Sequence, residues 1–490
     1  MAFLLNWLRR YRTRRQVRPW ALAVPIVILL IAVPLVRPLR HPDPRSISDD
    51  ELARLATTQA LVEDDRLDIG ASPFAVTGAK MQRNGRWYSN QPPMMSVLLA
   101  GPYRLMYRMG YSFESSPHWV MFMLTLLGTT LPVAGAGGLV YRMGRLFELR
   151  RPWRMGLALA VVLGSGLISY ATVLNAHAPA AALALASAGC LVHVTITNRR
   201  MHGSVWLLMA GACAALAATL EPAAIVFVVL FGAVVPALRW TTVQRLAGLV
   251  AFAAGAAVPL TAHVALVQRT TGNVWQGSGL GEGSGLKVQG SGEASSFLSS
   301  LNPEAGTLAS DYDEEQEPES AWRSFWAGAG RVATAFVGRH GVLSHFPVVL
   351  MGIIGVTMVM HRHWPATTKV LATATLAGAL AIIVAYALRA MDWTQAMFAT
   401  RWFVVFLPLT VFWAGVWLRR RHRPVSWALA GVLLTFSMVV SLIGATGPIP
   451  RDGFNVYTAA GAVRNLVHPR EPEADASVLA VVRDHGAESP

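Results

Sequence analysis

Residues 9–36 read RRYRTRRQVRPWALAVPIVILLIAVPLV. Arginine crowds the first part of this stretch, whereas the segment from Trp20 to Val36 contains no charged residue. An apolar helix of this length can cross the hydrocarbon core of a bilayer, and flanking arginines stay on the cytoplasmic side. The exit, Arg-Pro-Leu-Arg-His-Pro at 37–42, lacks the small-residue cleavage site of a signal peptide. We therefore expect a basic cytoplasmic N-terminus, 1–19, and a retained first transmembrane helix, 20–36.

The composition of the chain agrees with this start. Charged residues make up 14% of the sequence, whereas soluble proteins carry about 25%. The net charge of +15 comes largely from basic residues that adjoin apolar runs, so we expect membrane lipids and no nucleic acid as partners. The two cysteines, Cys190 and Cys213, lie inside apolar runs and predict neither a disulfide nor a zinc framework in the loops.

Further apolar segments follow along the chain and predict an all-α polytopic membrane protein with about eleven transmembrane helices. Their residues do not alternate between polar and apolar, so helices rather than barrel strands satisfy the backbone in the bilayer. The predicted spans are 20–36, 119–140, 155–173, 178–196, 204–220, 222–238, 246–267, 342–360, 370–388, 402–418 and 426–446.

Arginines and lysines in the short connections predict the orientation of these helices. They follow the second, fourth, sixth, eighth and tenth spans, on the side of the N-terminus, which is therefore cytoplasmic. These residues are Arg142, Arg145, Arg150, Arg151, Arg154, Arg199, Arg200, Arg239, Arg245, Arg362, Lys369, Arg419, Arg420, Arg421 and Arg423. The C-terminus is then outside.

This topology divides the chain into segments. Spans two to seven occupy 119–267 and spans eight to eleven occupy 342–446, while two long loops, 37–118 and 268–341, and the tail 447–490 lie outside, in the periplasm of a bacterium. The first loop has helical spacing of apolar residues and should fold on the membrane surface, with an interfacial helix from Met94 to Met109. The second loop is rich in Gly, Ser and Glu over 276–320, which predicts a flexible linker or lid.

An acidic cluster, Asp49-Asp50-Glu51, stands in the first outer loop. Mutual repulsion would raise the pKa of one carboxyl, which could then act as a base, or the cluster could bind a divalent cation. The structural alternative is a helix start, with Ser48 as N-cap and carboxylates favoured in the first turn.

Several motifs together resemble those of the GT-C membrane glycosyltransferases, which include protein mannosyltransferases and aminoarabinose transferases that use polyprenyl-phosphate sugars. The motifs that carry the resemblance are Asp50-Glu51, Ala60-Leu61-Val62-Glu63-Asp64, Tyr88-Ser89-Asn90-Gln91-Pro92-Pro93, the segment LNAHAPAA at 174–181, the segment FVGRHGVLSHFP at 336–347, and Ala399-Thr400-Arg401-Trp402 before Leu407-Pro408. The match spans roughly residues 20–420. The chain departs from the family pattern at Ala53-Arg54, where an aromatic residue is usual, and at Met94, where glycine often follows the prolines.

The resemblance implies a glycosyltransferase of the bacterial inner membrane with its active site facing outward. Family members use an acidic residue of the first outer loop to activate or orient the acceptor. This implies Asp50 as the catalytic base, with Glu51 as a helper or alternative and Asp49 as the residue one position away. The resemblance names no required cofactor, and a divalent cation stays an open possibility.

Cationic and polar residues near the outer helix ends are the candidates for holding the donor phosphate and the substrate. Arg401 is the first candidate, because a guanidinium can grip phosphate with two hydrogen bonds; a role as an interface arginine is the alternative. The others are His177, Arg339, His340, His345, Tyr88 and Gln91. Glu221, at the turn between the fifth and sixth spans, is expected to be a solvated residue or an N-terminal helix residue before Pro222.

Two other functions stay open on the sequence alone. A transporter or flippase would place ionisable residues near the bilayer midplane, often in two related halves. An O-antigen polymerase or ligase would also act on lipid-linked glycans at the outer face, with its main outer loop late in the chain. The early acidic loop favours the glycosyltransferase.

Overall fold

The computed structural model describes residues 20–37, 47–197, 200–270, 321–338, 341–388, 398–399, 401–419 and 422–446. The chain is an all-α membrane protein with one small sheet in these residues. Six of the described helices are long and apolar enough to cross a membrane, or seven if a bent pair ending at Met360 is one span. Three shorter apolar helices, Ala21–Leu35, Pro222–Ala237 and Leu407–Leu418, add to these. The predicted count of about eleven spans and their orientation stay predictions.

Each predicted span nevertheless coincides with helix. The first contains α2 (Trp20–Ala32) and η1 (Val33–Leu35), and the second contains α6 (Pro117–Thr125), η4 (Leu126–Thr130) and α7 (Leu131–Met143). The next elements are η5 (Gly144–Phe147), α8 (Arg151–Gly164), η6 (Ser169–Ala171), α9 (His177–Thr197), α10 (Arg200–Leu220), η7 (Pro222–Ala224), α11 (Ile225–Gly232), η8 (Val235–Ala237) and α12 (Thr242–Thr270).

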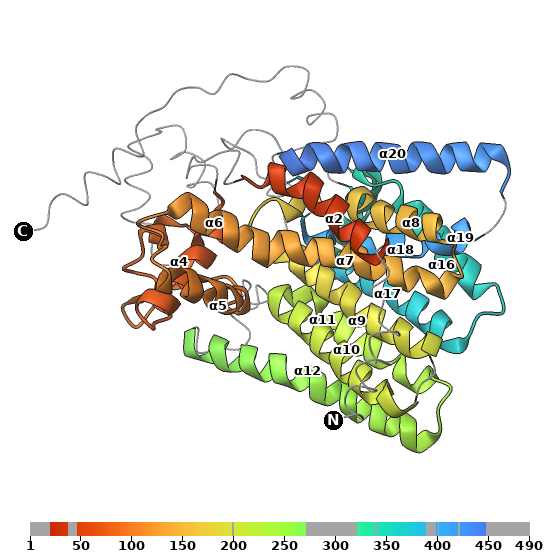
Figure 1. Ribbon diagram of the computed structural model, residues 1–490, viewed down its shortest axis with the longest axis horizontal. Helices are drawn as coiled ribbons and strands as arrows, with labels where there is room; N and C mark the ends of the chain where they lie inside the picture. Colours follow the sequence, from red (N-terminus) through yellow and green to blue (C-terminus); the bar gives the residue numbers. More distant parts are fainter. Residues whose placement is uncertain are drawn as a thin grey trace, which may run out of the picture.

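The later elements complete the bundle. They are α14 (Ala321–Val337), α15 (Val342–His345), α16 (Val349–Met360), α17 (Ala366–Leu388), η11 (Arg401–Phe403), α18 (Leu407–Phe412), α19 (Ala414–Leu418) and α20 (Pro424–Thr446). Figure 1 shows α12 and α20 along opposite sides of the bundle, with α9, α17 and α18 between them.

Small residues allow some helices to approach backbone to backbone. Gly211 on α10 and Gly255 on α12 face one another's helices so closely that a Cβ on either would come within about 2 Å of a carbonyl oxygen, of Phe252 and Leu208 respectively. Membrane helices commonly pack through such small residues, because lipid supplies no hydrophobic force between them. The α10–α12 pair is accordingly the most extensive of the helix contacts.

The described part of the predicted first outer loop, from residue 47 on, folds into a small unit at one end of the bundle (Figure 1). It contains α4 (Asp49–Glu63), η3 (Pro73–Val76), the antiparallel strands β1 (Lys80–Arg83) and β2 (Arg86–Ser89), and α5 (Met94–Arg108). Asn84 and Gly85 form the hairpin turn with φ of 51° and 74°, the positive values that a two-residue type I′ turn requires. α4 packs on α5.

Candidate functional site

The three adjacent carboxylates at the start of α4 have three different surroundings. Ser48 is the N-cap, and its hydroxyl accepts a hydrogen bond from the Glu51 amide at 3.4 Å. The exposed Asp49 accepts a hydrogen bond from the Gly78 amide at 3.1 Å and anchors the turn before β1 to the helix. The helix-start interpretation therefore accounts for Asp49.

Glu51 points to the opposite side, into the protein. Its side chain is 2% exposed and forms an ion pair with Arg37, which is 8% exposed and follows the first membrane helix. The amide of Arg37 also donates to the carbonyl of Thr172 at 2.9 Å, near η6. Glu51 thus ties α4 to the bundle, because a buried carboxylate requires a nearby cation.

Asp50 lies between these two residues and faces the end of the bundle. Its Oδ2 is 2.7 Å from Nη1 of Arg401, which begins η11. Its Oδ1 accepts a hydrogen bond of 2.8 Å from Nε2 of Gln91, in the loop between β2 and α5. Residues that lie 351 positions apart in the sequence therefore form one polar cluster, and three of the predicted site residues meet in it.

Arg54, one turn after Asp50, completes this cluster. Its Nη1 donates to the Asp50 carbonyl at 3.0 Å and its Nη2 donates to Oε1 of Gln91 at 2.7 Å. The Nε atoms of both Arg54 and Arg401 are buried without a hydrogen-bond partner in the described structure. A buried donor left unsatisfied costs about 1–3 kcal/mol, so two such donors beside one carboxylate are typical of a site that receives an anionic or polar ligand.

A second polar cluster lies beside the first, at the ends of α9, α10 and α17. Nδ1 of His177 is 2.5 Å from Oε2 of Glu221, a close ion-pair contact without the alignment of a hydrogen bond. The other carboxylate oxygen of Glu221 accepts a hydrogen bond of 2.6 Å from the hydroxyl of Tyr386. Asn175 caps α9 by accepting from the Ala178 amide at 2.9 Å, which holds His177 at the first position of the helix.

The charge of Asp50 interacts with cations of both clusters, Arg401 and Arg54 in the first and His177 in the second. Burial disfavours its charged form, but the positive charges of Arg401, Arg54 and His177 outweigh burial and lower the pKa of Asp50 below its usual 3.8. This direction is opposite to the one expected from repulsion within the acidic triplet. The reason is that Asp49 and Glu51 bind elsewhere, while Asp50 is left among cations.

The remaining predicted residues lie as follows. Tyr88 is half-buried on β2, opposite Met81, and forms no hydrogen bond with the Asp50 cluster among the described residues. His345 is fully buried in α15, with its Nδ1 3.0 Å from the Gly341 carbonyl oxygen and its ring edge-on to Phe398 at 5.7 Å. Arg339 and His340 lie outside the described residues, as do the tail from 447 and the segment 271–320.

Sequence reasoning missed four members of the site: Arg37, Arg54, Glu221 and Tyr386. Of the two alternatives for Glu221, a position at a helix N-terminus agrees with the structure, because the residue precedes η7 as its N-cap. The expectation that Glu221 is solvated is wrong, because the residue is 5% exposed and held by His177 and Tyr386. A carboxylate between two apolar helices is costly unless it is paired, and that cost was the signal that could have identified it. The sequence showed that Arg54 departs from the family pattern. Its contact with Gln91 could not be predicted, because it depends on the tertiary fold.

An apolar groove of about 400 Å³ lies between helices, one of which carries His177 and another of which ends beside Glu221. It lies between α5, η4, α7, α9 and α10, and its lining includes Pro179 and Leu220. Pro179 follows His177 by two residues, and Leu220 directly precedes Glu221. Other lining residues, Leu183 and Leu216, lie further along the same two membrane helices. The groove therefore extends along α9 and α10, and its lining comes within two residues of His177 and one residue of Glu221 in the sequence.

Metal ligands do not gather in the part of the chain that the structure describes. No group of three or more His, Cys, Asp or Glu side chains there is arranged to hold a metal ion. The acidic triplet does not act as a joint ligand set, because its three carboxylates point to Gly78, Arg401 and Arg37.

Comparisons with known proteins give structural likeness only. No family model matches the chain, and no curated protein matches by sequence. The chain is similar to solved structures of the Archaeoglobus fulgidus oligosaccharyltransferase. The apo form has 12% identity and a TM-score of 0.46, covering 88% of this chain and 57% of that one. A complex with zinc and sulfate has 12% identity and a TM-score of 0.43, covering 87% and 53%. The chain thus spans a little over half the length of that enzyme, and the function proposed below rests on this chain's own residues.

Proposed function

We propose that this chain is a membrane glycosyltransferase that moves a sugar from a polyprenyl-phosphate donor to an acceptor at the outer, periplasmic face of a bacterial inner membrane. One observation carries the proposal. A carboxylate, Asp50, is held by Arg401 beside two buried guanidinium Nε atoms that have no hydrogen-bond partner among the described residues, and an apolar groove lies between the membrane helices whose ends carry the neighbouring His177–Glu221 pair. A phosphate attached to a long hydrocarbon chain has the same division into an anionic and an apolar part.

The donor fits this arrangement in two parts. The prenyl chain lies in the groove between α5, α7 and α9, which has the size of a typical ligand pocket. Its phosphate lies against Arg401 and His177, and Nε of Arg401 supplies a charge-assisted hydrogen bond. Because such a donor cannot leave the bilayer, the acceptor has to approach from the water, over the first outer loop.

The reaction requires one bond to form and one to break at the anomeric carbon of the sugar. A hydroxyl of the acceptor attacks this carbon, and the bond to the phosphate oxygen breaks, so that polyprenyl phosphate leaves with the electron pair. Asp50 accepts a hydrogen bond from the attacking hydroxyl and takes its proton as the new bond forms. Arg401 stabilises the negative charge that grows on the leaving phosphate. Gln91 and Arg54 hold Asp50 in place.

The lowered pKa of Asp50 fits its proposed role as the group that accepts the proton of the attacking hydroxyl. A carboxylate that stays ionised can always accept the hydrogen bond of the acceptor, and it becomes protonated only late, when the attacking oxygen has become acidic. The position of the clusters at helix ends, not at mid-helix, favours transfer over the transporter or flippase alternative, whose ionisable residues would lie near the midplane. Neither that alternative nor the O-antigen polymerase or ligase has an observation in its favour.

The experiment compares membranes that contain the protein with membranes that lack it. Both are incubated with a panel of radiolabelled polyprenyl-phosphate sugars, and label is followed into lipid, glycan and protein fractions. We expect one donor to give a labelled product only in membranes that contain the protein. Absence of any protein-dependent product across the panel, with the protein inserted and folded, would contradict the proposal.

A further inference from the structure

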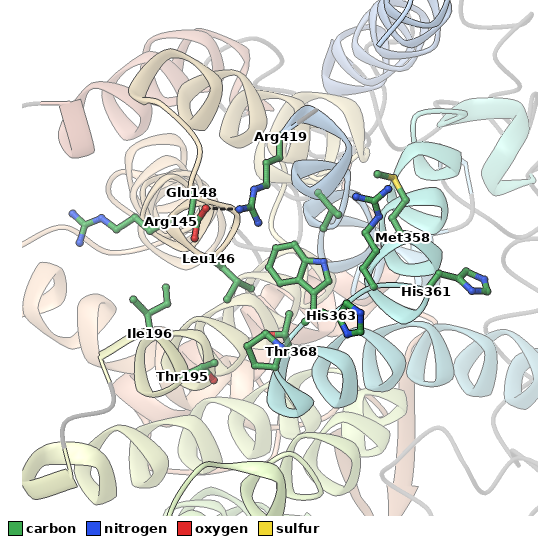
Figure 2. Close-up of a pocket in the computed structure, with 14 residues that line it drawn as sticks. Arg145, Leu146, Glu148, Thr195, Ile196, Met358, His361, His363, Thr368 and Arg419 are labelled. Atoms are coloured by element: carbon green, nitrogen blue, oxygen red, sulfur yellow. Dashed lines mark hydrogen bonds and ion pairs between the residues drawn. The ribbon is translucent and has the colours of Figure 1, made fainter. Parts of the chain in front are cut away.

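A second cavity, of about 920 Å³, lies far from the candidate site. Its lining includes Thr195 on α9 and Thr368 on α17, and Figure 2 shows these residues with Glu148 and Arg419 around it. Thr195 comes 18 residues after His177 on α9, and Thr368 comes 18 residues before Tyr386 on α17. At 1.5 Å per residue, each helix separates the cavity from the candidate site by about 27 Å. The cavity therefore lies at the opposite end of the bundle.

The lining of this cavity carries an excess of positive charge. Arg145, Arg362 and Arg419 contribute three guanidinium groups, and among the described residues of the lining the only carboxylate is that of Glu148. Glu148 is bound to one of them, at 2.5 Å from Nη2 of Arg419 (Figure 2). His361 and His363 add imidazole donors. Such a lining attracts an anion.

The wall also holds a buried hydroxyl that has no hydrogen-bond partner in the described structure. Thr368 is 1% exposed, and its Oγ1 is buried and unsatisfied. It stands in the first turn of α17, where the positive end of the helix dipole favours an anion. Arginines that served only to orient the chain in the membrane would need neither a cavity nor this hydroxyl.

We propose that this cavity binds a phosphate group, either as the head group of an anionic phospholipid or as free inorganic phosphate. Arg362 and Arg419 bind the phosphate oxygens, and the hydroxyl of Thr368 donates a further hydrogen bond. Phosphate then competes with Glu148 for Arg419. Basic cavities between membrane helices are the usual sites of anionic lipid head groups, and arginine matches the geometry of phosphate. The site is independent of the proposed transferase activity.

The test uses the full-length protein in a neutral detergent. Three probes are titrated separately while the melting temperature is followed: dioctanoyl phosphatidylglycerol, inorganic phosphate, and dioctanoyl phosphatidylcholine. We expect saturable stabilisation by phosphatidylglycerol and none by phosphatidylcholine. Saturation by phosphatidylglycerol alone identifies a lipid head group as the ligand, and saturation by inorganic phosphate as well identifies phosphate itself. No saturation by either anion would overturn the proposal.

Substitutions then locate the binding. The double change Arg362→Ala/Arg419→Ala should weaken binding by about tenfold or more, since it removes two charge-assisted hydrogen bonds. Arg150→Ala/Arg151→Ala is the matched control, because it removes two exposed arginines of the same end that do not line the cavity. Equal weakening by both pairs would mean unspecific attraction and would overturn the proposal.

Two single substitutions keep the test decisive if the double variant does not fold. Thr368→Val removes only the buried hydroxyl and should weaken the binding of phosphatidylglycerol. Glu148→Gln removes the carboxylate that competes for Arg419 and should strengthen it. If Thr368→Val leaves the affinity unchanged and Glu148→Gln weakens it, the cavity is not the binding site.

Discussion

At the scale of single residues, Asp50 owes its proposed role to the separation of three neighbouring carboxylates. Asp49 binds the backbone of Gly78, Glu51 binds Arg37, and only Asp50 faces Arg401 and Gln91. The side chain of Asp50 is 21% exposed, so it is open to an acceptor from the aqueous side while its charge is held by Arg401. The spacing of the triplet in the sequence could not reveal this separation, because it depends on partners that are far away in the chain.

The lowered pKa of Asp50 predicts how stability depends on pH. The ionised form stabilises the native state, so its contribution is present above the unfolded pKa of about 3.9 and is lost as the pH falls through the lower native pKa. The melting temperatures of the wild type and Asp50→Asn should therefore differ by a constant amount from pH 8 to about pH 5 and converge only below about pH 4. Convergence between pH 7 and pH 5 would mean a raised pKa instead.

Glu51 is predicted to support the fold and not the chemistry. Glu51→Gln removes the carboxylate from a buried ion pair with Arg37, and breaking such a pair costs about 3–5 kcal/mol. We expect a clearly lower melting temperature and an unchanged kcat for the molecules that remain folded. Arg104→Ala is the control, because its ion pair with Asp65 is exposed and should contribute little. A lost kcat with an unchanged melting temperature would instead place Glu51 in the reaction.

At the scale of elements, the long apolar helices were predictable and the short ones around the site were not. Runs of apolar residues identified α9, α10, α12, α17 and α20, because lipid demands a continuous apolar surface. The hairpin β1–β2 was not predicted, although Asn84-Gly85 is a typical signal for one. The start of α5 at Met94 agrees with the expected helix. The site lies where these short elements contact the ends of membrane helices. Hydropathy identifies apolar segments and does not predict which elements contact one another.

The groove between α5, α7 and α9 gives a prediction at this scale. A Cβ at Gly135 would meet no atom within 4 Å, so Gly135→Leu should fold while its side chain fills part of the groove. We expect KM for a long-chain donor to rise by about tenfold, because a well-filled site tolerates little added volume, with KM for a short-chain donor unchanged.

The matched control for this substitution is Gly431→Leu on α20. Gly431 also has open space at its Cβ position and does not line the groove. It should leave KM for both donors unchanged. An equal rise in KM for short and long donors in Gly135→Leu would contradict the assignment of the groove to the prenyl chain.

At the scale of the whole molecule, the chain has two chemically different ends. The unit that contains α4 and α5 lies at one end of the bundle (Figure 1), with the Asp50 and Glu221 clusters, and the arginine-lined cavity lies 18 residues away along α9 and α17, at the other end. Arginine placement in the sequence predicts that the end with the arginine-lined cavity is the cytoplasmic one, because basic loops stay in the cytoplasm, and this orientation stays a prediction. The placement of arginines could not predict the pairing of Asp50 with Arg401, because these two residues are 351 positions apart in the sequence and meet only in the folded bundle.

The predicted orientation can be tested with single cysteines in a variant that lacks Cys190 and Cys213. Val76 in the first outer loop is 81% exposed, and Val243 at the start of α12 is 78% exposed. A membrane-impermeant maleimide should label Val76→Cys in intact cells and Val243→Cys only after lysis. The reverse pattern would invert the topology and place the Asp50 cluster in the cytoplasm.

The most direct test of the transferase proposal compares Asp50→Asn with Asp49→Asn. Both remove one negative charge from the same helix start, and asparagine at 49 keeps an oxygen for the Gly78 amide. In proteoliposomes supplied with the active polyprenyl-phosphate sugar and its acceptor, Asp50→Asn should lower transfer by about 100-fold or more, and Asp49→Asn should leave it near the wild-type rate. Wild-type transfer by correctly folded Asp50→Asn would contradict the account.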